Sequence, residues 1–277
     1  MRARLHRLVA AAAIAAACPL TPPARASAQE GFRDADAGRP LRVEDAYPLK
    51  YLEWEWEAGA RSEWAEGGGW EGTASLGLAW GIVRNAELGL EAHPALARAS
   101  GASETGVEAF GPYILYNLNQ EGTRTPAFAA RADLALPGTG DVGRRDAGGR
   151  VHAIATRSFG RLRWHTNGGY AWASGRDGGD FWTGGLAADY PIGLFSRAVL
   201  ADVYAEIPAT RGRARVWAEL GARIQWTNEL VLDVGATTRL DQWSDGRPNV
   251  GLVLGLSRAF GFAGLTSVPP YPNPRID

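Results

Sequence analysis

Residues 213–240 have the sequence RARVWAELGARIQWTNELVLDVGATTRL. From Ala214 to Ile224 every even position is apolar, whereas the odd positions are mostly polar or charged. After a turn at 226–229 the alternation resumes and continues to Leu240. A period of two indicates a β-strand with two unlike faces. Each arm approaches the roughly 9–11 residues that a tilted strand needs to cross a bilayer, whereas soluble strands usually have about 5–6. The stretch therefore predicts a membrane-spanning hairpin.

The same alternation recurs along the chain and predicts twelve strands. They are expected at 52–59, 73–80, 86–93, 106–118, 128–136, 150–159, 162–172, 182–190, 197–206, 213–225, 230–240 and 249–262. Pro112 interrupts the fourth of them, where we expect a bulge or a bend, and the fourth and sixth leave open which face is apolar. An even number of long strands predicts an all-β fold, namely an antiparallel up-and-down transmembrane β-barrel over 49–262.

The connections support this count, because short and long ones alternate. Short turns are expected at 81–85, 158–161 and 226–229, and longer loops at 62–70, 93–105 and 138–149. Such barrels have short periplasmic turns and longer outer loops. Tryptophans near strand ends predict interfacial girdles, namely Trp54, Trp80, Trp172, Trp182, Trp226 and Trp243. A soluble sandwich would explain the alternation, but not strand length, loop lengths and export signal together.

The N-terminus has the features of an export signal. A basic start is followed by the apolar stretch 8–17 and by the small-residue cleavage site Ala26-Ser27-Ala28, which predicts a signal peptide at 1–28. The alternative is lipidation at Cys18. A charged, proline-bearing stretch at 29–48 is expected to be a periplasmic lead-in, and 263–277 a C-terminal tail.

Composition narrows the function classes. The 277 residues carry a formal net charge of −1, so there is no polybasic basis for nucleic-acid binding. No apolar run reaches the roughly 20 residues of a spanning helix. Three dispersed histidines, His93, His152 and His165, with no mature cysteine, argue against a metal site, and no cofactor motif is present.

The inward faces of the predicted strands carry charge, and these residues are the candidates to line the lumen. They are Glu53, Glu55, Glu57, Glu87, Glu91, Arg131, Asp133, Arg161, Arg163, His165, Asp202, Glu206, Arg213, Arg215, Glu219, Arg223, Asp233 and Arg239. The first and third strands are rich in Glu and the seventh and tenth in Arg, so opposite walls would carry opposite charge. Such walls either select permeating solutes or close the lumen with salt bridges.

Several short signatures resemble a known family, the outer-membrane "transporter" proteins of the MetA-pathway of phenol degradation. They are Arg39-Pro40, Leu136-Pro137-Gly138-Thr139-Gly140, Phe159-Gly160, His165 with Asn167, Gly185-Leu186-Ala187 and Asp189-Tyr190-Pro191. Their order spans most of the mature chain, although the Gly between Pro137 and Thr139 departs from the family's usual Pro-Thr-Gly. The resemblance implies an outer-membrane barrel that passes hydrophobic or aromatic compounds.

The resulting prediction is a passive channel for small solutes in the outer membrane of a Gram-negative bacterium. Its expected partners are outer-membrane lipid, small solutes and the barrel-assembly machinery, without nucleic acid. The alternatives are a non-conducting structural barrel with a salt-bridged lumen and a lipid-modifying enzyme. The enzyme would use a pair such as His152 and Ser158, in the absence of any recognisable catalytic motif.

Overall fold

Twelve strands make up the fold of the computed structural model. It describes residues 35, 37–65, 69–99, 102–172, 179–193, 196–227, 229–241 and 248–261. The strands are β1 (Glu53–Ala65), β2 (Trp70–Val83), β3 (Ala86–Ala99), β4 (Ala102–Asn119), β5 (Ala127–Gly140), β6 (Gly148–Phe159), β7 (Leu162–Trp172), β8 (Phe181–Ile192), β9 (Arg197–Pro208), β10 (Arg215–Gln225), β11 (Leu230–Arg239) and β12 (Pro248–Gly261). The expected signal peptide at 1–28, the tail at 263–277 and Trp243 lie outside the described residues.

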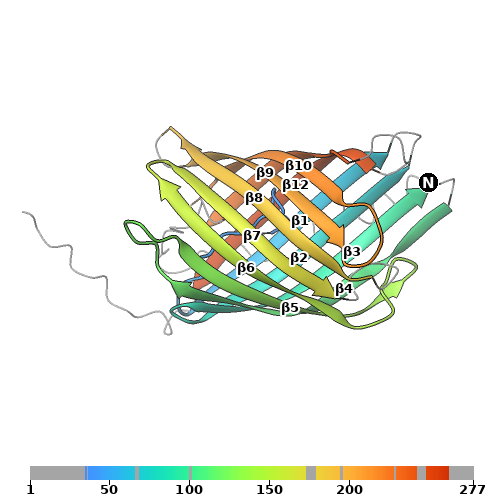
Figure 1. Cartoon of the computed structure of the whole chain (residues 1–277), viewed down its shortest axis with the longest axis horizontal. Helices are drawn as coiled ribbons and strands as arrows, with labels where there is room; N and C mark the ends of the chain where they lie inside the picture. Colours follow the sequence, from blue (N-terminus) through green and yellow to red (C-terminus); the bar gives the residue numbers. More distant parts are fainter. Residues whose placement is uncertain are drawn as a thin grey trace, which may run out of the picture.

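The strands form one closed antiparallel barrel, which confirms the predicted fold class (Figure 1). Each strand pairs with its neighbours in the chain, and β1 pairs with β12 to close the cylinder. The hairpin β10–β11 has the predicted register, with Leu220 opposite Ala236 and Arg223 opposite Asp233. Since every strand has two partners, the barrel leaves no open sheet edge among the described strands.

The two ends of the barrel differ in the length of their connections. Two-residue turns join β2 to β3 and β6 to β7 at the end where β1 begins, whereas longer connections follow β5, β7, β9 and β11 at the other end. The long loop expected at 93–105 is wrong, because β3 continues to Ala99 and β4 begins at Ala102. We call the two ends of the barrel the turn end and the loop end.

The outer face is apolar around the barrel. Leu220 is 61% exposed and Leu254 59% exposed, although both lie in the middle of paired strands. A face of this kind is stable in hydrocarbon and unfavourable in water. Trp54 stacks on Trp80 near the turn end, with ring centroids 5.2 Å apart, while Trp172 and Trp182 are exposed near the loop end. The barrel is therefore a membrane-spanning one with aromatic residues at both rims.

The structure also settles the facing of the two ambiguous strands. Tyr113 and Leu115 of β4 and Ile154 of β6 are buried inside, whereas their neighbours Ile114 and Val151 are exposed on the outer face. A shift in register does occur in β4, but it lies opposite Ala92–Pro94 of β3, and Pro112 itself pairs with Leu90.

The most consequential feature is inside the barrel. Residues 37–50, which we call the lumen segment, belong to the stretch expected as a periplasmic lead-in, yet they lie against the inner wall. Leu41 is 1% exposed and Val43 and Ala46 are fully buried. The segment turns at Gly38, whose φ of +95° favours glycine, and Gly38 N donates to Leu41 O at 2.6 Å.

Candidate functional site

The main chain of the lumen segment is held by polar side chains of the barrel wall. Asp202 of β9 accepts from the N–H groups of Arg42 (2.8 Å) and Val43 (3.2 Å). Asn167 of β7 accepts from Glu44 N at 2.7 Å and donates to Glu44 O at 2.8 Å. An irregular segment inside a barrel must find hydrogen-bond partners for its backbone, and these side chains supply them.

Further wall residues continue this pattern toward the turn end. Thr156 of β6 accepts from Ala46 N at 3.0 Å, and Asn117 of β4 donates to Ala46 O at 2.7 Å. Glu87 of β3 accepts from Leu49 N at 2.8 Å. The wall thus binds the segment from β3, β4, β6, β7 and β9.

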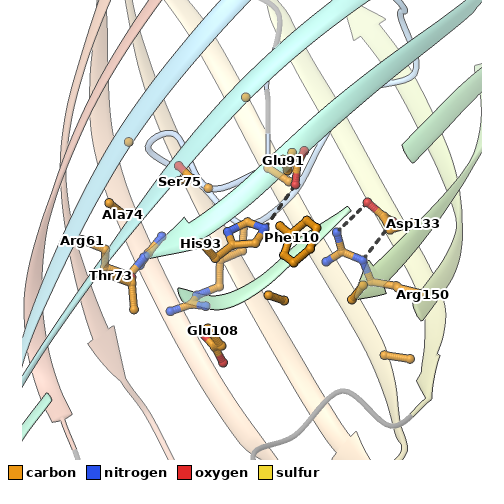
Figure 2. A pocket seen from close by; sticks show the side chains of 18 of the residues that line it. Arg61, Thr73, Ala74, Ser75, Glu91, His93, Glu108, Phe110, Asp133 and Arg150 are labelled. Atoms are coloured by element: carbon orange, nitrogen blue, oxygen red, sulfur yellow. Dashed lines mark hydrogen bonds and ion pairs between the residues drawn. The ribbon is translucent and has the colours of Figure 1, made fainter. Parts of the chain in front are cut away.

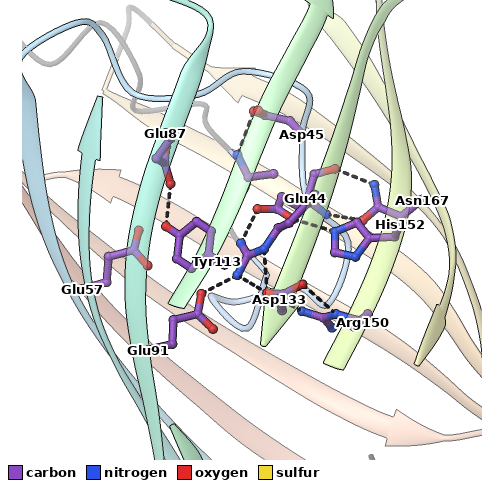
Figure 3. A network of polar contacts seen from close by, with 12 residues as sticks. Glu44, Asp45, Glu57, Glu87, Glu91, Tyr113, Asp133, Arg150, His152 and Asn167 are labelled. Carbon is purple, nitrogen blue, oxygen red and sulfur yellow. Dashed lines mark hydrogen bonds and ion pairs between the residues drawn. The ribbon is translucent and has the colours of Figure 1, made fainter. Parts of the chain in front are cut away.

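The charges of the segment are paired with opposite charges on the wall. Glu44 meets Arg131 of β5 at 2.6 Å and His152 of β6 at 3.1 Å (Figure 3). Arg39 pairs with Glu57 of β1 and Arg42 with Glu63. Buried charges that lacked such partners would cost several kcal/mol each, so these pairs fix where the segment lies.

Arg131 is the centre of the largest polar network. Besides Glu44 it contacts Glu91 of β3 at 2.6 Å and its strand neighbour Asp133 at 2.8 Å, and Asp133 also pairs with Arg150 (Figure 3). Burial alone would raise the pKa of Glu44, but the Arg131 guanidinium and the hydrogen bond to His152 outweigh it and lower that pKa. The carboxylate is therefore ionised at neutral pH.

Apolar contacts complete the docking of the segment. Leu41 and Val43 join a buried cluster with Leu200 and Trp217, and Ala46 joins a second one with Leu115 and Ile154. Pro40 lies over two wall glycines: a Cβ added at Gly221 would be 2.6 Å from Pro40 Cγ, and one at Gly235 would be 2.9 Å from Pro40 Cβ. The absence of side chains there makes room for the segment.

The predicted lumen residues share the inward face of their strands, with two exceptions. The inward-facing ones are Glu53, Glu55, Glu57, Glu87, Glu91, Arg131, Asp133, Arg163, His165, Asp202, Glu206, Arg215, Glu219, Arg223, Asp233 and Arg239. Arg213 is exposed in the connection before β10, where the alternation continues beyond the strand itself. Arg161 lies in the turn before β7 and donates to Pro191 O and Gly193 O, both at 2.8 Å.

The sequence predicted that oppositely charged walls would face each other across an open lumen. In the structure the charges instead pair with their near neighbours. Arg223 contacts Asp233 on the adjacent strand at 2.6 Å, Arg163 contacts Asp189 at 2.9 Å, and Arg215 contacts Glu206 at 2.6 Å. Other predicted charges, such as Glu57 and Arg131, pair with the lumen segment, whereas Arg239 pairs with Asp241. Much of the predicted charge therefore closes the lumen by ion pairs.

His152, which was suggested for catalysis, and His165 have other contacts. His152 meets Glu44, while the hydroxyl of Ser158 donates to Glu121 at 2.9 Å, so the suggested pair does not form. His165 links Thr156 (3.1 Å) to Asp189 (3.0 Å), in the connectivity of a hydrolase triad. All three are buried under the segment, and Thr156 already accepts from Ala46 N, which is the role that the geometry supports. The described residues contain no cluster of His, Cys, Asp or Glu suited to a metal ion.

A cavity of about 520 Å³ lies between the lumen segment and the loop end (Figure 2). Ala37, Gly38 and Arg42 of the segment line one side of it, and Trp217 and Tyr113 face it from the wall. In Figure 2 His93 points toward Glu91, and Arg150 toward Asp133. Volumes of this size accommodate small organic molecules.

The connection between β5 and β6 narrows this cavity. Val142 and Arg144 are buried, Arg144 N donates to Glu108 O at 3.0 Å, and Arg144 also lines the cavity. Sequence reasoning missed this inward loop, because nothing in the alternation distinguishes a loop that folds inward from one that stays outside. It also missed the wall residues that bind the segment, namely Asn117, His152, Thr156 and Asn167.

The fold and the lumen together define a class: a twelve-stranded membrane-spanning β-barrel whose lumen is occupied by its own N-terminal segment. No protein-family model matches the chain, and no curated protein sequence matches it.

Among solved structures the chain is similar to the COG4313 outer membrane channel from Pseudomonas putida F1. The TM-score is 0.61 at 14% identity, over 82% of this chain and 100% of that one. At this identity the likeness shows a common fold. The translocator domain of the autotransporter NalP from Neisseria meningitidis (TM-score 0.48, 12% identity, 76% of this chain and 89% of that one) is similar to a lesser degree. So is a Pseudomonas aeruginosa FadL homologue (TM-score 0.45, 10% identity, 81% and 97%).

Proposed function

We propose that this protein is an outer-membrane channel for the passive diffusion of small solutes, and that the lumen segment controls its opening. No covalent step is involved. The solute enters the cavity at the loop end and passes to the turn end when residues 37–50 leave their place on the wall.

One observation carries this proposal: the lumen is filled by a separate segment held largely by side chains of the wall. A lumen filled by wall side chains alone could open only by rebuilding twelve strands. Here the twelve-stranded ladder is complete without the segment, so the segment can move while the barrel stays folded. The crystal structure whose fold is similar carries the name of an outer membrane channel, which agrees with this function.

Recordings of the refolded full chain in a planar lipid bilayer test the proposal. We expect single-channel current steps that alternate between a closed level and an open level, because docking of the segment is reversible. A folded barrel that passes no current at any applied voltage would refute a channel function.

The second candidate is a non-conducting structural barrel, and the buried ion pairs of the lumen favour it. Arg223 with Asp233 and Arg163 with Asp189 would then serve stability alone. Reversing Arg215 to Glu separates the two functions. A channel should change its ion selectivity, because Arg215 lines the cavity, whereas a sealed scaffold should only lose stability.

Further parts of the proposal concern the cell. We propose export by a signal peptide at 1–28 and insertion by the barrel-assembly machinery into the outer membrane of a Gram-negative bacterium. We also propose membership in the MetA-pathway of phenol degradation family, and with it hydrophobic or aromatic solutes. This proposal rests on the resemblance of short signatures such as Arg39-Pro40, which lies on the lumen segment. Assays of phospholipid turnover would separate this channel from a lipid-modifying enzyme.

A further inference from the structure

Three residues that line the cavity carry buried N–H groups which have no acceptor among the described residues. They are Arg61 of β1 through Nη2, Arg144 of the β5–β6 connection through Nε and Nη2, and Trp217 of β10 through Nε1. Buried donors are almost always hydrogen-bonded, and each exception calls for a missing partner. Among the described residues that line the cavity these unpaired side-chain groups are all donors, whereas Glu219 Oε2 and Asp202 Oδ1, in buried wall residues beside Arg42, are unpaired acceptors.

Most acids that line the cavity are already bound by a basic side chain. Glu91 and Asp133 contact Arg131, and Glu206 contacts Arg215. Glu57 and Glu63 are paired with arginines of the lumen segment. Most of the negative charge at the cavity is therefore already neutralised, whereas an anionic solute would meet donors that lack a partner.

Arg61 of β1 and Trp217 of β10 lie in one cluster with several arginine side chains. Arg61 and Arg42 both contact Glu219 and Glu63, and the Arg42 guanidinium lies 4.5 Å from the centre of the Trp217 ring. Two further arginines that line the cavity, Arg239 and Arg215, lie 5.3 and 5.9 Å from the same ring. We call Arg42, Arg61, Arg215, Arg239 and Trp217 the Trp217 cluster.

Arg144 adds a further cation from the inward loop. Burial lowers the pKa of Arg144, and Glu108 and Asp146 offset this only in part. Its Nε and Nη2 groups have no acceptor among the described residues, and an added anion would supply one.

Aromatic rings accompany these donors. Tyr204 lies beside Trp217, with ring centroids 6.1 Å apart, and Tyr113 and Phe181 also line the cavity. Such rings offer apolar contact to the body of a solute, while the N–H groups select its charged end.

We propose that this cavity binds a small carboxylate with an apolar body. The carboxylate accepts hydrogen bonds at the Trp217 cluster, from Arg61 and the Trp217 indole, while Arg144 adds positive potential from the loop. This proposal deepens the channel function and rests on it, because the bound anion is taken to be the passing solute.

Isothermal titration calorimetry of the folded full chain in detergent micelles at pH 7 tests the binding. The probes are benzoate, benzylamine and benzyl alcohol, which share a ring and differ in charge. We expect benzoate to bind about tenfold or more tightly than the other two, because a hydrogen bond to a charged group contributes at least that factor. Equal affinity for benzoate and benzylamine, or no measurable binding of benzoate, would overturn the proposal.

Two variants locate the site. Trp217→Phe keeps a ring but removes the N–H, and should weaken benzoate about tenfold. Trp182→Phe is the matched control, because Trp182 is 57% exposed on the outer face, and its affinity should equal that of the wild type. Should Trp217→Phe fail to fold, Arg144→Gln decides instead, with an expected loss of a few-fold. Wild-type affinity in the folded variant refutes the assignment.

Binding and conduction are separate readouts. Benzoate binding without current in bilayers would refute the channel and leave the anion site standing. Current without a preference for benzoate would refute the anion site and leave the channel standing.

Discussion

Neutralising Glu44 should open the lumen. In Glu44→Gln the side chain keeps its size but loses the charge that meets Arg131 at 2.6 Å and His152 at 3.1 Å. Arg131 keeps Glu91 and Asp133 as partners, so the substitution leaves no isolated charge on the wall. The barrel is therefore expected to fold normally, while the lumen segment binds less tightly.

The magnitude follows from the two contacts. A hydrogen bond to a charged group contributes about 1.5–3 kcal/mol and a neutral one about 0.5–1.5 kcal/mol. The Arg131 guanidinium stays charged, so Glu44→Gln weakens the two contacts but does not abolish them. The docked segment loses about 1–3 kcal/mol, which raises the ratio of released to docked segment about 5- to 150-fold.

Single-channel recordings in planar bilayers measure this ratio as the open probability. The matched control is Glu229→Gln, since Glu229 pairs with Arg258 at 3.1 Å near the turn end and has no contact with Glu44 among the described pairs. We expect the control to have the open probability of the wild type, and Glu44→Gln to have a higher one. If the open probability of Glu44→Gln equals that of the wild type and of Glu229→Gln, the contacts of Glu44 with Arg131 and His152 do not hold the segment.

The other predictions use the same site and the outer face. The pKa of Glu44 is lowered from its ordinary value of 4.5, so its contribution to docking is present above that value and is lost as the pH falls through the lowered pKa. The open probability should therefore rise in acid, and this rise should be smaller in Glu44→Gln. Identical pH profiles of the two proteins would contradict a role of the Glu44 charge in docking. Gly235→Ala should raise open probability several-fold by pushing Pro40 from the wall, whereas Gly168→Ala, whose added Cβ meets nothing within 4 Å, should leave it unchanged. Leu220→Arg places a cation on the outer face and should lower the free energy of unfolding in lipid vesicles by about 2–4 kcal/mol, measured by urea titration; a loss below about 0.5 kcal/mol would mean that this face is not in hydrocarbon.

The barrel itself was predictable from the alternation of side chains. In the β10–β11 hairpin Leu220 faces out and Arg223 faces in, as the sequence predicts, because a strand in a barrel has only two faces and each has its own solvent. The alternation is less informative where both faces are apolar. In β4 the lumen side carries Leu115, which packs with Ala46 of the segment, and Tyr113, which lines the cavity, and the sequence offers no sign of either.

The lumen segment could not have been predicted in the same way. Its stretch of alternation, Leu41 and Val43, is too short for a strand, and it follows Gly38 and Pro40. Backbone partners such as Asp202 and Asn167 lie more than a hundred residues away in the chain and become neighbours only when the barrel closes. Apart from Arg161 and Arg213, the predicted lumen charges lie on the inward face, but their partners on the segment were missed.

We infer that the lumen opens when residues 37–50 leave the wall, although ion pairs of the wall also narrow it. The most direct test replaces residues 37–46 by a Gly-Ser linker of equal length and compares its single-channel current with that of the wild type. We expect a steadily open channel in the variant and an intermittently open one in the wild type. Equal currents from the two proteins would contradict this inference. So would the absence of current from a variant whose resistance to SDS at room temperature shows that it is folded.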